Sequence, residues 1–352
     1  MYALIIVGAG PAGSTLGREL SRVRADMKIL IIDGMPRGGS KVCGGLLSPD
    51  AQAVLRSQGI ALPDEILVSP QAQTVDTIDL TAKIHRRYAR DYVNMDRARF
   101  DRFLLSLTEG KVELVEGRCV DAKRCDVGFE VRVNIGGEYK AFGSRLLVGA
   151  DGASSIVRSS LYPEKGIYRY VSIQEWYADQ GKDLPDYSCI YDEKTSDSCS
   201  WTIRKNGFYI FGGAFPKKGC RDAFSEQKSR LEAFFGESLG EPEKREACLV
   251  CSPRGAGEIF LGEGGAYLVG EAAGFISASS FEGISSALPS GTALAEAIAE
   301  ADGIEEITAL YKRKTVKLRL KILTKIPKMK ILCAPALRKL IMKSGVTAEK
   351  IY

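Results

Sequence analysis

Three glycines near the start of the chain are spaced so that they could hold a phosphate group. Gly8, Gly10 and Gly13 form the pattern G-x-G-x-x-G, which follows the apolar run "ALIIV" and precedes the helix-like run "STLGREL". The first glycine permits a tight turn, the second lets the backbone approach a pyrophosphate, and the third lets the helix pack closely on the strand. The N-terminus of the helix would then face the phosphate charge.

An acidic residue follows at the spacing that a nucleotide ribose requires. Asp33 ends the next apolar run, "MKILIID", 20 residues after Gly13. A carboxylate there can accept hydrogen bonds from both ribose hydroxyls, and it disfavours a 2′-phosphate. Because strand, glycine turn, helix and acid occur together, we predict a dinucleotide site that suits FAD or NAD rather than NADP.

Two later segments narrow the choice of dinucleotide. The first, "RLLVGADGASSIVR", is a strand followed by a turn that contains Asp151. The second, "AYLVGEAAGFISASSFEGIS", has a strand that ends at Gly270 and Glu271, and then a turn at Gly283 and Ile284 that opens a long helix. No second G-x-G-x-x-G unit occurs, so we expect no separate NAD(P)H domain.

In these segments the chain resembles the flavoprotein superfamily that contains the p-hydroxybenzoate-hydroxylase-like monooxygenases and the geranylgeranyl reductases. Four elements share its order: the glycine pattern, a K-x-C-G-G element at residues 41–45, "ADGASSIVR", and a segment of the type G-D-A-A-G…E-G-I. The K-x-C-G-G element is similar to that of the geranylgeranyl reductase branch, which also holds the FixC-type flavoproteins. "VGEAAGFISASSFEGIS" and "CAPALRKLIMKSGV" look still more like the bacterial CbrA-type FAD-dependent oxidoreductases.

The resemblance implies FAD as the cofactor. It implies a cofactor site that comprises Gly8, Gly10, Gly13, Asp33, Cys43, Gly44, Gly45, Arg97, Asp151, Gly270, Glu271, Gly283 and Ile284. The first three glycines would hold the pyrophosphate and Asp33 the adenosine ribose. Arg97 matches an arginine that reaches the phosphate region in this superfamily; the alternative is a salt bridge to a neighbouring acid.

The later positions receive roles in the same way. Asp151 would support the loops around the cofactor, and it could also cap backbone amides in its own turn. Glu271 stands where the family usually has aspartate, so the resemblance implies a contact to the ribityl chain or pyrophosphate that is shifted or goes through water. Gly283 and Ile284 would offer backbone N–H groups to the pyrimidine edge of the flavin, where the helix dipole favours negative charge.

We predict an α/β fold (α+β overall) in three parts. The parts are a Rossmann-type FAD-binding domain at 1–65, 93–165 and 255–306, an inserted antiparallel-sheet substrate domain at 66–92 and 166–254, and a basic helical C-terminal segment at 307–352. Alternating apolar and polar residues predict the antiparallel strands. The dipeptide Asn206-Gly207 predicts a tight hairpin turn between two of them.

Cys43 and Trp201 are the two residues that we consider for the substrate side of the site. Cys43 could act chemically near the flavin, or it could only shape a loop whose glycines let the backbone approach the ring or the substrate. Aromatic residues are concentrated in the predicted substrate domain, and most of them would pack the sheet. Trp201 is the best single candidate for a substrate contact, because it alone matches the Y-x-W-x-F-P element of the archaeal geranylgeranyl reductases.

The remaining composition excludes several classes of site. The single histidine, His85, argues against zinc hydrolases and Ser-His-Asp hydrolases, and we expect no metal site. Cys248 and Cys251 form the one C-x-x-C pair, but a strand places them on opposite faces, so packing is the main interpretation. Without a signal peptide or an apolar run of membrane-spanning length, we expect a cytoplasmic protein, and a peripheral position at the inner face of the membrane is the alternative.

The positive charge is concentrated near the C-terminus. Residues 307–348 contain 12 Lys plus Arg and no Asp or Glu, although the chain as a whole has a net charge of +5. Apolar residues at helical spacing alternate with these bases, and Pro327 and Pro335 should break the segment into two or three helices. The segment could pack on the FAD domain, contact a membrane through residues 307–345, or receive an acidic protein; nucleic acid is not expected.

Three functions follow from these observations. The first is a FAD-dependent oxidoreductase that transfers a hydride between flavin N5 and a hydrophobic, isoprenoid or quinone-like, small molecule or lipid. Its electron donor would be NAD(P)H or a ferredoxin-like protein. The second is a flavin-dependent monooxygenase, and the third is a non-catalytic FAD-binding protein at the membrane surface.

Overall fold

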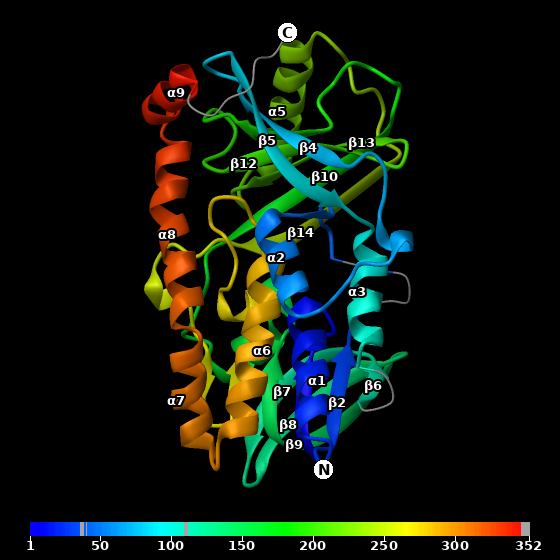
Figure 1. The fold of residues 1–352 in the computed structure, drawn as a ribbon, viewed down its shortest axis with the longest axis vertical. Coiled ribbons are helices and arrows are strands. Elements are labelled where there is room, and N and C mark those ends of the chain that lie inside the picture. Colours follow the sequence, from blue (N-terminus) through cyan, green and yellow to red (C-terminus); the bar gives the residue numbers. More distant parts are fainter. Residues whose placement is uncertain (36–38, 40, 109–111, 346–352) are drawn as a thin grey trace. The chain divides into compact units, whose positions relative to one another are not determined.

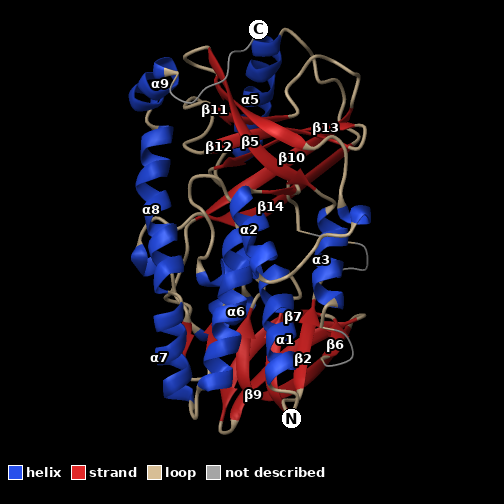
Figure 2. Ribbon diagram, viewed as in Figure 1, coloured by secondary structure: helices blue, strands red, loops and turns tan. Residues whose placement is uncertain are grey.

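The computed structural model describes residues 1–35, 39, 41–108 and 112–345, which form two compact units. The first unit comprises residues 1–40, 98–168 and 251–324, and the second comprises residues 41–97, 169–250 and 325–352. Figures 1 and 2 show the helices and strands of both. The predicted α/β fold with a Rossmann-type domain and a second sheet is confirmed.

A largely parallel sheet forms the centre of the first unit. Its strand order is β15-β16-β9-β1-β2-β6, and the hairpin β7–β8 joins it through β9. Its strands are β1 (Tyr2–Val7), β2 (Ile29–Asp33), β6 (Glu113–Glu116), β7 (Arg118–Cys125), β8 (Gly128–Ile135), β9 (Glu138–Gly149), β15 (Gly262–Glu263) and β16 (Ala266–Leu268). The strands β16, β9, β1, β2 and β6 run parallel to one another. Strands covered on both faces need continuous apolar sequence, which explains the run "LIIV".

Helices cover this sheet. They are α1 (Pro11–Val23), α3 (Arg97–Ser106), α4 (Ile156–Leu161), α6 (Ile284–Glu300), α7 (Ile304–Lys314) and the first part of α8 (Val316–Cys333). Figure 1 shows α1 and α6 side by side. They approach closely because Gly291 of α6 has no side chain: a Cβ there would lie 2.5 Å from the carbonyl oxygen of Ala12 in α1.

The second unit is built on a mixed sheet with the order β14-β10-β13-β12-β11-β4-β5-β3. Its strands are β3 (Leu46–Leu47), β4 (Ala72–Asp79), β5 (Ile84–Asn94), β10 (Arg169–Ala178), β11 (Tyr187–Tyr191), β12 (Cys199–Lys205), β13 (Phe208–Phe215) and β14 (Lys244–Cys251). Its helices are α2 (Pro49–Ser57), α5 (Cys220–Phe235), the end of α8, and α9 (Pro335–Ser344). One face of the sheet packs on α5 through Phe211, Phe224 and Leu231.

The expectation of a purely antiparallel second sheet is wrong at one pair of strands. β4 and β11 are parallel, with Cys189 opposite Thr77. The chain leaves the second unit after β4 and β5, passes through the first unit at residues 98–168, and returns before β10 and β11. Such a long connection can bring a strand back in the same direction, whereas a short hairpin cannot. The hairpin predicted at Asn206-Gly207 is confirmed, and both residues have positive φ, of 47° and 78°.

The C-terminal segment is helical, and the prediction that both prolines break it is confirmed for Pro335 and wrong for Pro327. Pro327 lies inside α8, which continues through it, whereas Pro335 is the first residue of α9. A proline inside a helix removes one backbone hydrogen bond without always ending the helix. In the first unit α7 is packed through Ile307, Leu310 and Tyr311, which are buried in the main core. Among the described residues, no helix is both long enough and apolar enough to cross a membrane.

The predicted three-part domain division stays a prediction. Both compact units draw on several separate parts of the chain, and the largest differences from that division lie at two places. Residues 41–65, which contain the K-x-C-G-G element, lie in the second unit. The basic segment is shared, because residues up to 324 lie in the first unit and residues from 325 lie in the second.

Candidate functional site

The glycine turn of the first unit leaves open space at the N-terminus of α1. A Cβ built on Gly10 would meet no atom within 4 Å, whereas one on Gly13 would lie 2.0 Å from the carbonyl oxygen of Gly8. Gly8 has a φ of +105°, and a Cβ there would lie 2.5 Å from the Ala150 carbonyl oxygen. Gly8 and Gly13 therefore serve the close packing of strand and helix, and Gly10 leaves room for an external group.

The first turn of α1 is prepared for an anion. Its N-cap, Gly10, supplies no side-chain hydrogen bond, Pro11 follows, and the turn contains no acidic residue. The N–H groups of such a turn carry partial positive charge and bind phosphate oxygens well. The space at Gly10 and these amides fit the pyrophosphate of a dinucleotide.

Asp33 lies at the carboxyl end of β2, as predicted for a ribose-binding residue. Its side chain is half-buried, and the amide of Met35 donates a hydrogen bond to it at 3.3 Å. Burial raises the pKa of the Asp33 carboxyl, and the charge of Asp101 raises it further, while backbone hydrogen bonds to the carboxylate oppose the shift. The hydroxyls of a bound ribose would add donors that favour the ionised form.

Asp151 caps the backbone of its own turn. Its carboxylate accepts hydrogen bonds from the amides of Ile156 at 2.7 Å and Val157 at 3.2 Å, and from the Ser155 hydroxyl. Burial raises the pKa of the Asp151 carboxyl, and these hydrogen bonds lower it in part. The capping role is thus present in the structure, and the predicted supporting role near the cofactor stays a prediction.

The Glu271 carboxylate binds a backbone amide of the first unit. Its Oε1 accepts a hydrogen bond from the amide of Cys251 at 2.8 Å. The adjacent Gly270 adopts a φ of +57°, and its amide donates to the Ser290 hydroxyl of α6 at 2.9 Å. The longer side chain in place of the usual aspartate is therefore accommodated by a hydrogen bond to the Cys251 amide of the same unit, while its predicted cofactor contact stays a prediction.

Arg158 holds the segment that contains these residues. Its guanidinium is buried and donates to the carbonyls of Ala272 at 2.8 Å and Glu258 at 3.2 Å. It thereby ties α4 to the turn that follows β16. The sequence motif "ADGASSIVR" contains Arg158, but its spacing alone did not reveal this role.

Gly283 and Ile284 lie at the N-terminus of α6, as predicted. Gly283 is the N-cap, and no side chain caps the helix there. The 17 residues of α6 give the helix a full dipole, so its first turn favours negative charge. This is the property that the pyrimidine edge of a flavin would use.

The second unit contains a separate cluster around the K-x-C-G-G element. Lys205, the last residue of β12, donates from Nζ to the carbonyl oxygens of Gly44 at 2.7 Å and Met95 at 2.8 Å. A Cβ on Gly45 would lie 2.0 Å from that Nζ, and one on Gly44 would lie 2.3 Å from Ile203 Cδ1. In this structure the two glycines therefore have a packing function: they let the loop close on β12 and its terminal lysine.

Cys43 lies between two cations in this cluster. The Gly45 amide donates to its Sγ at 3.4 Å, and the Arg97 guanidinium also forms a hydrogen bond with it. Burial would raise the pKa of the Cys43 thiol, but Arg97, the Gly45 amide and Lys205 together hold it below its ordinary value. Burial lowers the pKa of Lys205 to about 8, against the opposing influence of Cys43 and Asp96. Arg97 thus lies beside a thiol within its unit, and its predicted phosphate contact stays a prediction.

A test of this cluster is the pH dependence of Cys43 alkylation. We expect iodoacetamide to label Cys43 with a midpoint below the ordinary thiol value of about 8.5. Lys205→Met should raise that midpoint by about one pH unit, because it removes a positive charge that favours the thiolate. Peptide mass spectrometry distinguishes Cys43 from the other cysteines. Lys244→Met, which removes an exposed lysine of β14, is the matched control; an unchanged midpoint in Lys205→Met would contradict this assignment.

Trp201 occupies the face of the second sheet that is opposite to α5. It pairs across the sheet with Gly212, where a Cβ would lie 2.7 Å from the indole Nε1. Its Nε1 is also 3.9 Å from a Cβ built on Gly44, so the indole lies beside the K-x-C-G-G element. The buried Nε1 has no hydrogen-bond partner among the described residues. A buried donor left in this state costs about 1–3 kcal/mol, which a ligand oxygen could offset.

Gln174 presents a matching acceptor in the same row of the sheet. It pairs with Gly212 from the other side, and its Nε2 donates to Glu246 at 2.9 Å. Trp176 donates to the same carboxylate at 2.8 Å. Because Gln174 donates to Glu246 through Nε2, its amide has a fixed orientation. The buried Oε1 of Gln174 has no hydrogen-bond partner among the described residues. Neither Gln174 nor Lys205 was predicted from sequence, because a lone polar residue in a strand carries no motif.

The comparisons with known proteins agree with this geometry. Residues 1–173 match the family described as FAD binding domain. Protein CbrA of Escherichia coli O6:H1 is 42% identical over 350 residues, which cover 98% of this chain and 94% of that protein. The chain belongs to the CbrA family. The predicted family is thereby confirmed.

Solved structures extend the likeness of this CbrA-family protein at the level of the fold. A geranylgeranyl bacteriochlorophyll reductase-like protein from Thermoplasma acidophilum has a TM-score of 0.81 and 17% identity, over 99% of this chain and 92% of that chain. The p-nitrophenol 4-monooxygenase PnpA from Pseudomonas putida has a TM-score of 0.71 and 14% identity, over 98% of this chain and 93% of that chain. The cofactor of the CbrA-family protein is FAD, and the chain is an FAD-binding protein of an oxidoreductase family.

Proposed function

We propose that this CbrA-family protein is an FAD-dependent oxidoreductase that reduces or oxidises a hydrophobic substrate of isoprenoid or quinone-like class. Bound FAD supplies hydride chemistry at N5, and the protein must provide a proton and a binding surface. The observation that carries the proposal is the cluster of Cys43, Arg97 and Lys205, since it holds an acidified thiol next to the Trp201 indole.

Cys43 would supply the proton in the reducing direction. Two-electron reduction of an activated C=C bond adds a hydride to one carbon and a proton to the other. The S–H bond of Cys43 breaks as the new C–H bond forms, and the thiolate remains between Arg97 and Lys205. Water then returns the proton. A thiol whose pKa is held below its ordinary value is a better acid near neutral pH.

The sheet face around Trp201 would bind the substrate. The aromatic residues Trp176, Tyr187 and Trp201 point to this face, which suits an apolar molecule. The unsatisfied Trp201 Nε1–H would donate a hydrogen bond to one polar substituent of the substrate, such as a hydroxyl, and that hydroxyl would donate to Gln174 Oε1.

The likeness to solved structures supports reduction more than hydroxylation. The TM-score is 0.81 with the geranylgeranyl bacteriochlorophyll reductase-like protein and 0.71 with the monooxygenase PnpA. A flavin monooxygenase nevertheless remains the second candidate, because "ADGASSIVR" is a segment that the hydroxylases share. The electron donor that we propose is NAD(P)H or a ferredoxin-like protein.

Anaerobic reoxidation tests the proposal. We expect an unsaturated isoprenoid alcohol or a quinone to restore the visible absorbance of flavin in dithionite-reduced protein. Cys43→Ser should keep FAD bound but slow C=C reduction about tenfold to a thousandfold, because a hydroxyl is a far weaker acid than this thiol. The product of C=C reduction in D2O should carry two deuterium atoms, one on each carbon, because the N5–H of reduced flavin exchanges with solvent before transfer.

Three results would contradict parts of this proposal. Reoxidation that needs oxygen, with an oxygen atom added to the product, would establish the monooxygenase instead. No reoxidation by either substrate class would favour the non-catalytic alternative. Full C=C reduction by Cys43→Ser would remove Cys43 from the proton transfer while leaving the oxidoreductase assignment intact.

A further inference from the structure

Helix α9 of the second unit buries one of its cations, Arg338, and exposes three of its apolar residues. Arg338 and Met342 are buried, each with 2% of its surface exposed. Leu337, Leu340 and Ile341 are exposed at 48%, 67% and 45%. Positions 337, 340 and 341 share one side of a helix, because each residue turns it by about 100°. This is the reverse of the pattern in a surface helix that only packs on its own domain.

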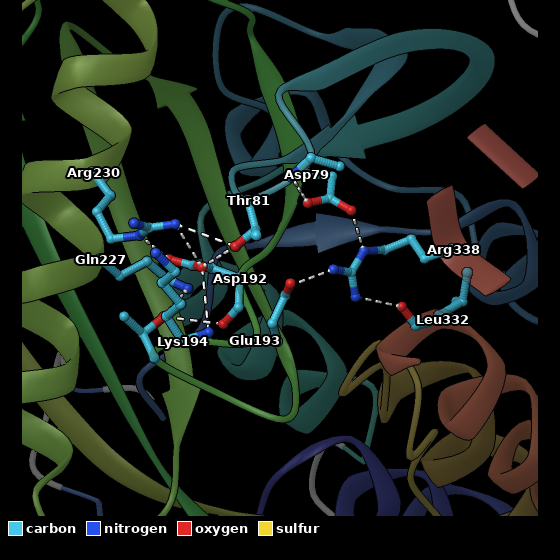
Figure 3. Close-up of polar contacts among 11 residues, drawn as sticks. Asp79, Thr81, Asp192, Glu193, Lys194, Gln227, Arg230, Leu332 and Arg338 are labelled. Atoms are coloured by element: carbon cyan, nitrogen blue, oxygen red, sulfur yellow. Dashed lines mark hydrogen bonds and ion pairs between the residues drawn. The ribbon is translucent and has the colours of Figure 1, made fainter. Parts of the chain in front are cut away.

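Buried ion pairs hold the helix in this orientation (Figure 3). Arg338 donates from Nε to Asp79 and from Nη2 to Glu193, both at 2.7 Å. Its Nη1 donates to the Leu332 carbonyl at 3.0 Å. Arg86 of β5 donates to the Met342 carbonyl, also at 3.0 Å, near the end of α9. Because these hydrogen bonds fix Arg338, helix α9 cannot rotate to bury Leu337, Leu340 and Ile341 without breaking them.

Lysines border the apolar face. Lys339 and Lys343 are exposed on α9, and Lys328 and Lys330 are exposed near the end of α8. The segment 307–348 itself contains no acidic residue. An exposed apolar stripe bordered by exposed lysines is typical of helices that lie in the interface of an anionic bilayer. Each lysine near such a surface is attracted by about 1 kcal/mol.

We propose that α9 is a membrane-docking helix, in which Leu337, Leu340 and Ile341 enter the headgroup region of an anionic bilayer. Lys339 and Lys343 contact the lipid phosphates. Arg338 does not touch the lipid and acts as the anchor that presents the helix. The combination of charge and apolar surface favours a bilayer over an acidic protein. An acidic protein would neutralise the lysines but would leave the three apolar side chains in a polar interface. An anionic bilayer accommodates both the lysines and the apolar side chains.

Vesicle sedimentation of the FAD-loaded protein tests the proposal. We expect binding to phosphatidylcholine vesicles that contain phosphatidylglycerol, little binding to phosphatidylcholine alone, and release at high salt. The variant Leu337→Gln/Leu340→Gln/Ile341→Gln should bind at least about tenfold more weakly, because it loses most of the apolar area that enters the lipid. Lys339→Gln/Lys343→Gln should lose the preference for phosphatidylglycerol.

A matched control removes the same number of exposed apolar side chains elsewhere. Leu114, Val127 and Tyr139 are exposed in the first unit at 44%, 68% and 64%, and their triple replacement by glutamine should leave vesicle binding unchanged. FAD content and the thermal midpoint should match the wild type in all variants, because every altered side chain is exposed.

Two outcomes would overturn the proposal. One is wild-type protein that remains in the supernatant with phosphatidylglycerol vesicles, or an α9 triple variant that sediments with them like the wild type. The other is concentration-dependent self-association that the α9 variant abolishes, which would make a second copy of this chain the occupant. Neither outcome depends on turnover, so both are independent of the proposed redox function.

Discussion

Replacing Gly10 by valine is expected to remove FAD while leaving the folded chain as stable as the FAD-free wild type. A Cβ at this position meets no protein atom within 4 Å, and the backbone there is extended, with φ −67° and ψ −176°. Any residue adopts this conformation, and a side chain slightly reduces the freedom of the unfolded chain. The same side chain would fill the space that the pyrophosphate needs. We expect FAD binding to weaken by about a hundredfold or more, or about 3 kcal/mol.

Gly13→Val provides the contrast for this experiment. Its Cβ would lie 2.0 Å from the Gly8 carbonyl oxygen, which belongs to backbone and cannot move aside cheaply. We therefore expect this variant to lose stability by about 3 kcal/mol or more, with or without FAD. Thermal unfolding of FAD-free protein, followed by titration with FAD, separates the two effects. Equal destabilisation by both substitutions would contradict the distinction between a packing glycine and a cofactor glycine.

Arg338→Met is the second substitution with a large expected effect. It leaves the Asp79 carboxylate, which is 1% exposed, buried without its cation. Removing one partner of a buried ion pair costs about 3–5 kcal/mol, because the other charge stays uncompensated. We expect this loss to release α9 from the second unit before the rest of the chain unfolds, since a terminal helix can open locally. Hydrogen exchange within α9 measures it directly and should rise by about a hundredfold or more.

A double substitution tests whether the uncompensated charge of Asp79 causes this loss. Asp79→Asn with Arg338→Met should recover part of the loss, because the remaining partner is then neutral. Lys339→Met, which changes an exposed neighbour on the same helix, should leave exchange in α9 unchanged. If Arg338→Met alone exchanged like the wild type, Arg338 would not be the anchor of this helix.

Sequence was most informative where one backbone geometry admits few residues. Gly8, Gly13 and Asp33 identified the strand, turn and helix of the first unit because each must satisfy a local packing or spacing rule. The turn at Asn206-Gly207 was predicted for the same reason, as both residues adopt positive φ. At Gly13 and at the Asn206-Gly207 turn the determining contacts lie within a short stretch of chain.

Long-range packing escaped prediction for the opposite reason. Lys205 directly precedes the predicted turn and no motif marked it, yet it reaches the carbonyl of Gly44, which lies 161 positions earlier. Likewise Arg338 was assigned to a basic tail, although its partner Asp79 is 259 positions away. Charge in a sequence suggests exposure, and only the fold reveals that these two cations are buried. The parallel pairing of β4 with β11 was missed in the same way, because it depends on where the chain goes in between.

The chain passes between the two units five times, after residues 40, 97, 168, 250 and 324. Neither unit is therefore a contiguous stretch of chain that a single cut could release. β1 must also wait for β9, whose Leu146 pairs with Leu4, before the central parallel sheet can close. During synthesis at a ribosome, β1 and the glycine turn thus emerge long before β9, which supports them in the sheet. Until the middle of the chain has been made, the apolar residues of β1 stay exposed and can be bound by chaperones.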